Sequence, residues 1–510
     1  TITTSYNTYC ICLNLATACI AWHCFGRIFR DDRIGLMCSA LYTLSIIRIY
    51  KLAIVGAVGE GSALTFLPLI FYGMYMVLAC GASSNPEASS IGSSERAADR
   101  EAADREAAGK KKYSADAGGT PARGRAWAYL AFGYAGLMQT HVLTCEITAF
   151  LTLLICLICI RRIFRKNEFL LLLKGAAGAV GLSFYYLVPF LDYYITQDMH
   201  IRHVSGRTIQ ERGLYFAQLF VNTWTENTRE WLGTKGMIDV EPVSPGTLCM
   251  LTLIMFFILW GIDVIRYFRG AGNASDHIGS KSGIDPADVS IRATARLSAI
   301  FSGMLLVMTL HRFPWNRIQE LGPVMASLVS SLQFPNRFLG WAMVFLIMVF
   351  GYCVYRFAGK RFAYPVGILL TVLSIVTGSL CLLKDSSDED HRLYLYNEAG
   401  MGFGYISGGE YLVEGTDDLL LTFEGPKAQE GVEISSYIKH YQSVRLNCRN
   451  TNDEESYVDL PLLLYKGYQA KSADGNRLFL CAGDNGRVRV LLPAGFTGEA
   501  RVDFVSPAYW

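Results

Sequence analysis

Long apolar segments alternate with short polar loops over the first three quarters of the chain. A helix needs about 20 mostly apolar residues to cross a bilayer, and about ten segments reach or approach that length. The pattern therefore predicts a polytopic α-helical membrane domain over residues 1–383. Its expected spans are 7–26, 34–51, 62–80, 126–142, 145–160, 168–190, 246–265, 296–311, 338–356 and 362–383.

Basic residues set the expected orientation of these spans. They cluster in alternate loops, and Lys and Arg are typical of cytoplasmic loops. One orientation satisfies every cluster: residues 81–125 are then cytoplasmic, and residues 191–245 form an external loop. Both flanks of residues 126–160 are basic, so the chain crosses an even number of times there, which fits two short spans. The basic clusters lie at 27–33, 110–125, 161–166, 266–296 and 356–361.

The cytoplasmic insert at 81–125 is rich in Ser, Ala and Gly and carries the tandem repeat Ala-Ala-Asp-Arg-Glu at 97–101 and 102–106. Because it offers no apolar face to bury, a flexible linker is expected, with a short charged helix as the alternative. The chain starts at Thr1 on the external side, so we expect a further N-terminal piece that contains at least one span.

A different pattern begins at residue 384. Short alternating stretches such as Leu478-Phe479-Leu480 are separated by Gly, Asp and Asn, which predicts an external antiparallel β-sandwich over 384–510. Of the 14 cysteines in the chain, Cys448 and Cys481 belong to this domain, in strands expected to be adjacent. A disulfide in an oxidising compartment and two free thiols are both open.

Composition excludes several classes of protein. Hydrophobic residues make up 52% of the chain and charged residues only 18%, which excludes a disordered protein and favours a membrane protein. The 46 basic and 44 acidic residues give a net charge of +2, so no excess of positive charge is available for nucleic acid. There is no HExxH zinc motif and no glycine-rich nucleotide motif, and no metal ligands are predicted.

Candidate chemistry gathers at the expected external ends of the spans. Arg48 and Tyr50 precede Glu60, and charges at the hydrocarbon edge are costly unless they are paired or face a cavity. An Arg48–Glu60 ion pair and a substrate site are both open. Gln139 and His141 end another span; His141 could carry a proton, bind phosphate when charged, or only bond to a carbonyl at a helix end.

Two further sets of side chains could bind a substrate. Trp224, Glu226 and Trp231 in the external loop combine aromatic rings with a carboxylate, as saccharide sites do, although an interfacial aromatic belt has the same composition. Gln333 and Arg337 precede the span at 338–356. A guanidinium suits phosphate oxygens, and anchoring of a helix to lipid headgroups is the alternative role for Arg337.

Several short motifs occur together in a fixed order along the chain, and with them the sequence resembles the YfhO-like bacterial membrane proteins. That group is similar to the GT-C glycosyltransferases and overlaps with proteins labelled as membrane proteins related to 6-pyruvoyl-tetrahydropterin synthase. The motifs are Gly56-Ala-Val-Gly59-Glu60, Gln139-Thr140-His141, Gln333-Phe334-Pro335-Asn336-Arg337-Phe338, Gly409-Glu410-Tyr411-Leu412, and Leu460-Pro461 continuing to Tyr465-Lys-Gly467-Tyr468.

The resemblance implies a multi-pass enzyme of the bacterial cytoplasmic membrane. Such an enzyme transfers a sugar from a polyprenyl-phosphate carrier to a cell-envelope polymer or lipid on the external face, where the C-terminal domain also lies. The lipid-linked sugar is the donor; some GT-C enzymes also use a divalent metal. The alternative is a non-enzymatic lipid-carbohydrate transporter or an envelope-assembly scaffold.

The resemblance also suggests roles for residues. GT-C enzymes usually carry the catalytic carboxylate in the first external loop, which this chain is expected to lack, so Glu60 is the best remaining carboxylate. Glu60 and His141 are the expected catalytic residues, since acceptor deprotonation and stabilisation of the leaving phosphate are the chemistry required. The expected substrate-binding residues are Arg48, Tyr50, Gln139, Gln333, Arg337, Trp224, Glu226 and Trp231.

The orientation can be tested with single cysteines introduced as Gly408→Cys and Ser114→Cys, after the reactive native thiols have been blocked. Because all basic clusters agree with one orientation, a membrane-impermeant maleimide should label residue 408 in intact cells and residue 114 only after permeabilisation. The reverse pattern would invert the topology and move every candidate residue to the other face.

Overall fold

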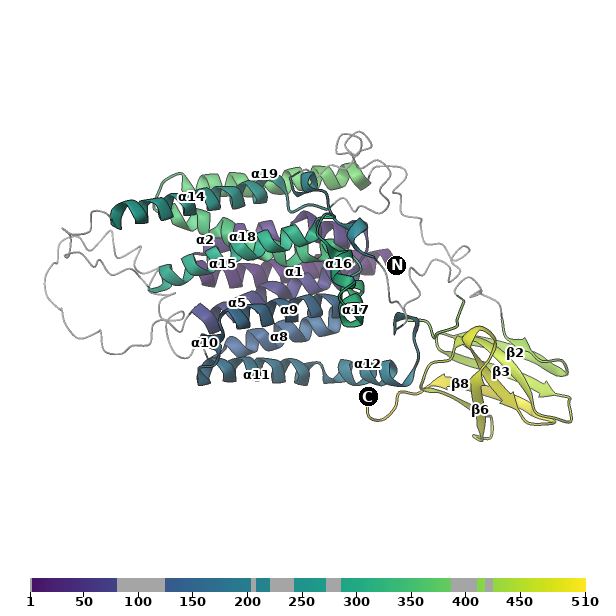
Figure 1. The fold of residues 1–510 in the computed structure, drawn as a ribbon. Helices are drawn as coiled ribbons and strands as arrows, with labels where there is room; N and C mark the ends of the chain where they lie inside the picture. The colour runs from purple at the N-terminus through teal and green to yellow at the C-terminus, as the bar shows by residue number, and fades with distance from the viewer. Residues whose placement is uncertain are drawn as a thin grey trace, which may run out of the picture. The chain divides into compact units, whose positions relative to one another are not determined.

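The structure is a computed structural model, and it falls into two compact units, which Figure 1 shows as a set of helices and a group of strands. Unit 1 contains Thr1–Ser183 and Arg207–Arg392, and unit 2 contains Phe184–Gly206 and Leu393–Trp510. The sequence alone puts the boundary near residue 384, whereas the contacts assign residues 184–206 to unit 2. The structure describes residues 2–79, 124–202, 208–220, 243–271, 286–386, 411–417 and 425–510.

Unit 1 is helical, and a helix covers each of the ten segments expected to span the membrane, the end of one of them lying in unit 2. Its first half contains α1 (Ile2–Phe29), α2 (Asp32–Thr43), α3 (Ile46–Ile49), η1 (Tyr50–Ile54), α4 (Val58–Ala63), η2 (Leu64–Phe66), α5 (Leu67–Ala79), α8 (Ala126–Thr140), α9 (Val142–Ile158), α10 (Ile160–Ile163) and α11 (Lys166–Leu182). The second half contains η6 (Gln210–Arg212), η7 (Phe216–Leu219), α14 (Thr247–Ala271), α15 (Pro286–Thr309), α16 (Trp315–Gln319), α17 (Pro323–Ser331), η8 (Pro335–Phe338), α18 (Leu339–Arg356) and α19 (Ala363–Ser386).

Several of these helices are long and apolar enough to cross a membrane, as expected of a membrane protein. Within the described ranges there are six, or up to eight if each of two bent helix pairs counts as one span. The expected number of ten is not reached there, because α8 has 15 residues and α9 has 17. The six are Thr4–Phe29, Val58–Leu78, Thr247–Arg269, Ala287–Thr309, Pro335–Arg356 and Ala363–Leu380.

The centre of unit 1 is α18. Every residue from Leu339 to Val354 is buried, and the helix packs against α15, α14, α2 and α1, among which it lies in Figure 1. Its sequence is apolar on all sides, as expected of a helix that is buried in a core or in a membrane, and here the neighbouring helices cover it. By contrast, α14 and α19 expose many apolar side chains, as expected of helices that face lipid.

Unit 2 consists of α12 (Phe184–Thr196), η5 (His200–Arg202) and an antiparallel β-domain, so the antiparallel β-structure expected of this domain is confirmed. The strands form one continuous sheet in the order β1-β4-β7-β6-β5-β8-β3-β2. The edge strands β1 and β2 also lie close together, which makes the sheet barrel-like. The strands are β1 (Lys427–Ala428), β2 (Val432–His440), β3 (Ser443–Asn450), β4 (Ser456–Leu463), β5 (Tyr468–Ser472), β6 (Arg477–Ala482), β7 (Arg487–Leu492) and β8 (Thr497–Phe504), with η12 (Asp484–Gly486) between β6 and β7.

The core of the β-domain follows the period of two that defines a half-buried strand. In β7, Val488, Val490 and Leu492 are fully buried, and their counterparts in β3, β4 and β8 face the same interior. The strand register places buried residues of neighbouring strands side by side, since Val458 of β4 pairs with Val490 of β7. The alternation visible in the sequence therefore identifies the buried face of these strands.

The two cysteines of the β-domain are free thiols. Cys448 lies in β3 and Cys481 in β6, and β8 and β5 lie between these strands, so the expected adjacency is wrong. Three strand spacings amount to about 14 Å. A disulfide needs Cα atoms within about 7 Å.

Burial raises the pKa of the Cys448 thiol to about 11. The thiolate is the nucleophile, so we expect iodoacetamide at pH 8 to alkylate Cys448 at least about tenfold more slowly in the folded protein than after unfolding. Peptide mass spectrometry without reductant measures the rate and the redox state together. Recovery of a peptide that links Cys448 to Cys481 would contradict this strand order.

Candidate active site

A cluster of charged side chains surrounds one aromatic ring in unit 1. The Phe334 cluster contains Lys51 of η1, Glu60 of α4, Arg212 of η6, Phe334, and Arg337 of η8. Its members come from four separate parts of the chain, so long-range packing assembles it. The cluster brings together Glu60 and Arg337, which the sequence suggested independently.

The Glu60 carboxylate is shared between two cations. Its Oε2 lies 3.6 Å from Nζ of Lys51 and 3.8 Å from Nε of Arg337. The side chains of Lys51, Arg337 and Glu60 are only 3%, 8% and 10% exposed. Charges buried to this extent are costly unless they are paired, so the carboxylate holds the two cations together.

Three cations lie over the ring of Phe334. The side chains of Arg212, Arg337 and Lys51 lie 5.0, 5.6 and 5.9 Å from the ring centroid. The face of an aromatic ring attracts a cation at such distances, which stabilises positive charge without neutralising it. The ring thus gathers three cations next to a single carboxylate.

The backbone at Gln333 is strained in a way that orients Arg337. Gln333 has a φ of 60°, in the left-handed region that costs a residue with a side chain about 1–2 kcal/mol. In this conformation its Oε1 accepts a hydrogen bond of 2.9 Å from Nη2 of Arg337, and the Leu332 carbonyl accepts one of 2.9 Å from Nη1. The turn therefore determines how the guanidinium is oriented.

Two glycines position Glu60. Gly56 has a φ of 67° in the turn between η1 and α4, a conformation that glycine adopts without strain. Gly59 lies against the turn between α8 and α9, where an added Cβ would be 2.8 Å from the carbonyl oxygen of Thr140 and 3.6 Å from Cδ2 of His141. The absence of a side chain at position 59 therefore lets Glu60 and His141 occupy neighbouring turns.

His141 is the N-cap of α9. Its Nδ1 accepts a hydrogen bond from the backbone N–H of Thr144 and lies 2.8 Å from the Thr144 hydroxyl oxygen. Because Nδ1 accepts this hydrogen bond, Nε2 is the ring nitrogen that can donate to a ligand. Binding of phosphate by the charged ring stays a prediction.

Arg48 belongs to a different network from Glu60, so the Arg48–Glu60 ion pair is wrong. The guanidinium is buried and donates to Oγ1 of Thr17 at 2.8 Å and to Oδ1 of Asn14 at 3.1 Å. It also lies over the ring of Tyr42. These contacts fasten α3 to α1, a structural role that the sequence did not separate from substrate binding.

The remaining expected substrate ligands do not join the Phe334 cluster in the part of the chain that the structure describes. Tyr50 is buried in the apolar core of unit 1. Gln139 donates to the Leu182 carbonyl at 3.3 Å, at the end of α11. Glu146, one turn beyond His141, accepts from the hydroxyl of Ser331. Trp224, Glu226 and Trp231 lie outside the described residues.

Sequence reasoning did not single out Lys51, Arg212 or Phe334. Phe334 lies inside the Gln333–Phe338 motif, and Lys51 follows Tyr50. Both are therefore sequence neighbours of residues that were already candidates for the site. No sequence pattern near Arg212 indicates that it belongs to the site. For metals, the described ranges contain no group of three or more His, Cys, Asp or Glu side chains that could hold an ion.

The close approach at Gly59 generates a stability prediction. In Gly59→Ala the new methyl group would collide with a backbone carbonyl, which cannot rotate away as a side chain can, so we expect a loss of about 1–3 kcal/mol. Thermal unfolding of the full chain in nanodiscs measures it. Gly261→Ala in α14 is the matched control, since a Cβ there meets open space. Equal stability of the two variants would exclude this packing.

No family model, no curated protein and no solved structure matches the chain. The charges, distances and conformations around Phe334 are therefore the observations on which a function can be based. They describe a buried, cation-rich site with one carboxylate and one histidine beside it.

Proposed function

We propose that the chain is a membrane glycosyltransferase of the GT-C kind, similar to the YfhO-like proteins, that uses a polyprenyl-phosphate-linked sugar as donor. The observation that carries the proposal is the Phe334 cluster, in which Lys51, Arg212 and Arg337 surround one ring and a single carboxylate. A phosphate group carries the charge that such a set of cations attracts.

The two cations that flank Glu60 suit a leaving phosphate. As the bond between the anomeric carbon and the phosphate oxygen breaks, negative charge develops on the phosphate, and buried cations stabilise it more strongly than water would. Arg337 and Lys51 both lie within 4 Å of the same carboxylate oxygen, so a phosphate bound beside it would meet both of them. The His141 ring, whose Nδ1 accepts from Thr144, can donate its Nε2–H to a phosphate oxygen.

Glu60 suits the role of general base. Its distances to Lys51 and Arg337 exceed a hydrogen-bond length, which leaves acceptor capacity on the carboxylate for a hydroxyl group. In the proposed step, an acceptor hydroxyl attacks the anomeric carbon and its proton passes to Glu60. The products are the glycosylated acceptor and the free polyprenyl phosphate, so atoms and charge balance without a cofactor.

The proposed setting is the bacterial cytoplasmic membrane, with the carrier tail in the bilayer and transfer on the external face to a cell-envelope polymer or lipid. Several helices of unit 1 are long and apolar enough for such a location. The orientation follows from the basic loops of the sequence.

Carrier binding tests the proposal. Titrating a short-chain polyprenyl phosphate against the full chain in nanodiscs should give a binding constant that Arg337→Ala weakens about 10- to 150-fold, because a charged hydrogen bond contributes about 1.5–3 kcal/mol. Arg337→Lys should restore only part of the affinity, since an ammonium cannot form the two-pronged contact of a guanidinium.

The matched control is Arg317→Ala, which removes an exposed arginine from α16. It should leave carrier affinity unchanged. Arg337 also bonds to its own turn, so circular dichroism and the unfolding temperature of each variant must match wild type; the lysine variant serves if the alanine variant misfolds. If both folded Arg337 variants bind the carrier as tightly as wild type does, the arginine only anchors its helix to lipid headgroups and the proposal is wrong. Carrier binding without any sugar transfer would instead favour a transporter.

A further inference from the structure

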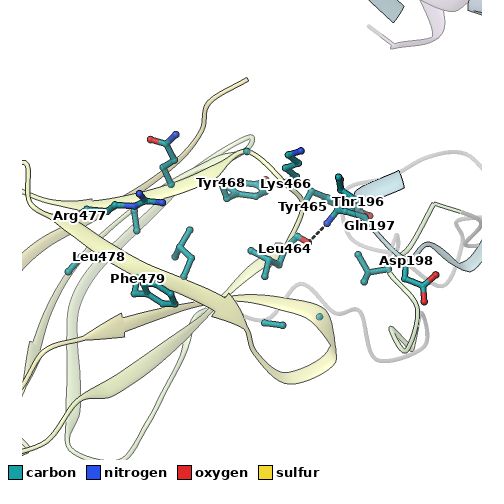
Figure 2. A pocket seen from close by; sticks show the side chains of 17 residues that line it. Thr196, Gln197, Asp198, Leu464, Tyr465, Lys466, Tyr468, Arg477, Leu478 and Phe479 are labelled. Carbon is teal, nitrogen blue, oxygen red and sulfur yellow. Dashed lines mark hydrogen bonds between the residues drawn. The ribbon is translucent and has the colours of Figure 1, made fainter. Parts of the chain in front are cut away.

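Unit 2 contains an open cleft of about 540 Å³. Figure 2 shows its walls: Thr196, Gln197 and Asp198 at one end, the segment from Leu464 to Tyr468, and Arg477, Leu478 and Phe479 of β6. All of these residues belong to unit 2. The cleft is large enough to hold a small ligand.

The cleft lies where two neighbouring strands separate. Pairing between β5 and β6 is confined to Ala470↔Leu478 and Lys471↔Arg477. Before Ala470, β5 pairs only with β8, and beyond Leu478, β6 pairs only with β7. The opening is therefore part of the sheet architecture: β5 and β6 form part of its walls, and the β4–β5 loop at 464–467 and the end of α12 form much of the rest.

The end of α12 is tied to the wall of this opening. Nε2 of Gln197 donates to the Leu464 carbonyl at 3.3 Å, and the hydroxyl of Tyr193 donates to the Lys466 carbonyl at 2.9 Å. Asp192 accepts from Nζ of Lys466 at 2.6 Å and from Nε1 of Trp510 at 2.9 Å. These bonds make the end of the cleft as well defined as its strand walls.

The lining combines an aromatic platform with side chains that form hydrogen bonds. Phe479 lines the cleft and is 70% exposed, so its ring is open to contact with a ligand. Arg477 and Asp198 are also exposed. Oε1 of Gln197 is buried and accepts no hydrogen bond from any described residue. An acceptor left in this state is costly, and a donor on a ligand would satisfy it.

We propose that this cleft binds a saccharide chain. A sugar ring presents an apolar C–H face that stacks on an aromatic ring, and its hydroxyl groups both donate and accept, which matches Phe479 together with Gln197, Asp198 and Arg477. The lining carries both signs of charge, since Lys466 and Arg477 line the cleft together with Asp198, so it offers a sugar both donors and an acceptor. The identification of this chain as the acceptor polymer rests on the proposed function; the binding itself does not.

The test measures binding of oligosaccharides to the full chain in nanodiscs, which avoids competition from sugar-based detergents. Cellotetraose, chitotetraose and maltotetraose are the probes, and saturation-transfer NMR and calorimetry are the readouts. At least one probe should bind, and Phe479→Ala should weaken it about fivefold, the loss expected for one stacked ring. Phe479→Tyr keeps the ring and should bind as wild type does.

The matched control is Tyr441→Ala, which removes another highly exposed aromatic ring of unit 2 outside the cleft. It should not change the affinity. The proposal is overturned if none of the three probes binds, or if wild type and Phe479→Ala bind a probe equally well. It is also overturned if an alanine tetrapeptide binds in place of the probes, which would indicate a peptide groove. Polyprenyl-phosphate titration of the same samples separates the outcomes, because loss of saccharide binding with carrier binding intact leaves the transferase proposal standing.

Discussion

The arrangement of the candidate site in unit 1 depends on one requirement: charges removed from water must be paired. Glu60 can be buried because Lys51 and Arg337 lie within 4 Å of its carboxylate, and these cations can be buried because they share that carboxylate and the face of Phe334. No local segment contains all four residues. The pairing therefore brings the η1–α4 and α17–η8 connections to one place, and removal of one partner would leave a costly unpaired charge.

The apolar core of unit 1 supports this arrangement. Because α18 is apolar on every side, its neighbours enclose it, and η8, which carries Arg337, leads directly into its first turn. The left-handed turn at Gln333 is thus held between α17 and a rigid, buried helix. Strain of this kind persists only where the surroundings determine the conformation, and here it orients the guanidinium that the proposed phosphate chemistry requires.

Unit 2 combines a buried core with an opening in its sheet. Its barrel-like sheet buries alternate residues, yet the separation of β5 from β6 leaves an opening that α12 borders. The exposed ring of Phe479 lies in the lining of this opening, where the proposed saccharide would stack on it. A transferase that acts on a polymer needs a site for the reacting hydroxyl and a site that retains the chain, and the two units offer one candidate for each.

The sequence by itself determined the classes of structure. Apolar length and the period of two depend on neighbouring residues, so they identified the helices, the β-domain and its buried face. The short motifs in the sequence also contained Glu60, His141, Gln333 and Arg337. Only the tertiary structure decided which side chains meet: it paired Glu60 with Lys51 and Arg337 instead of Arg48, separated Cys448 from Cys481, and added Arg212. The reason is physical, since an ion pair or a strand neighbour between distant segments depends on how the whole chain packs, and no local pattern encodes that partner.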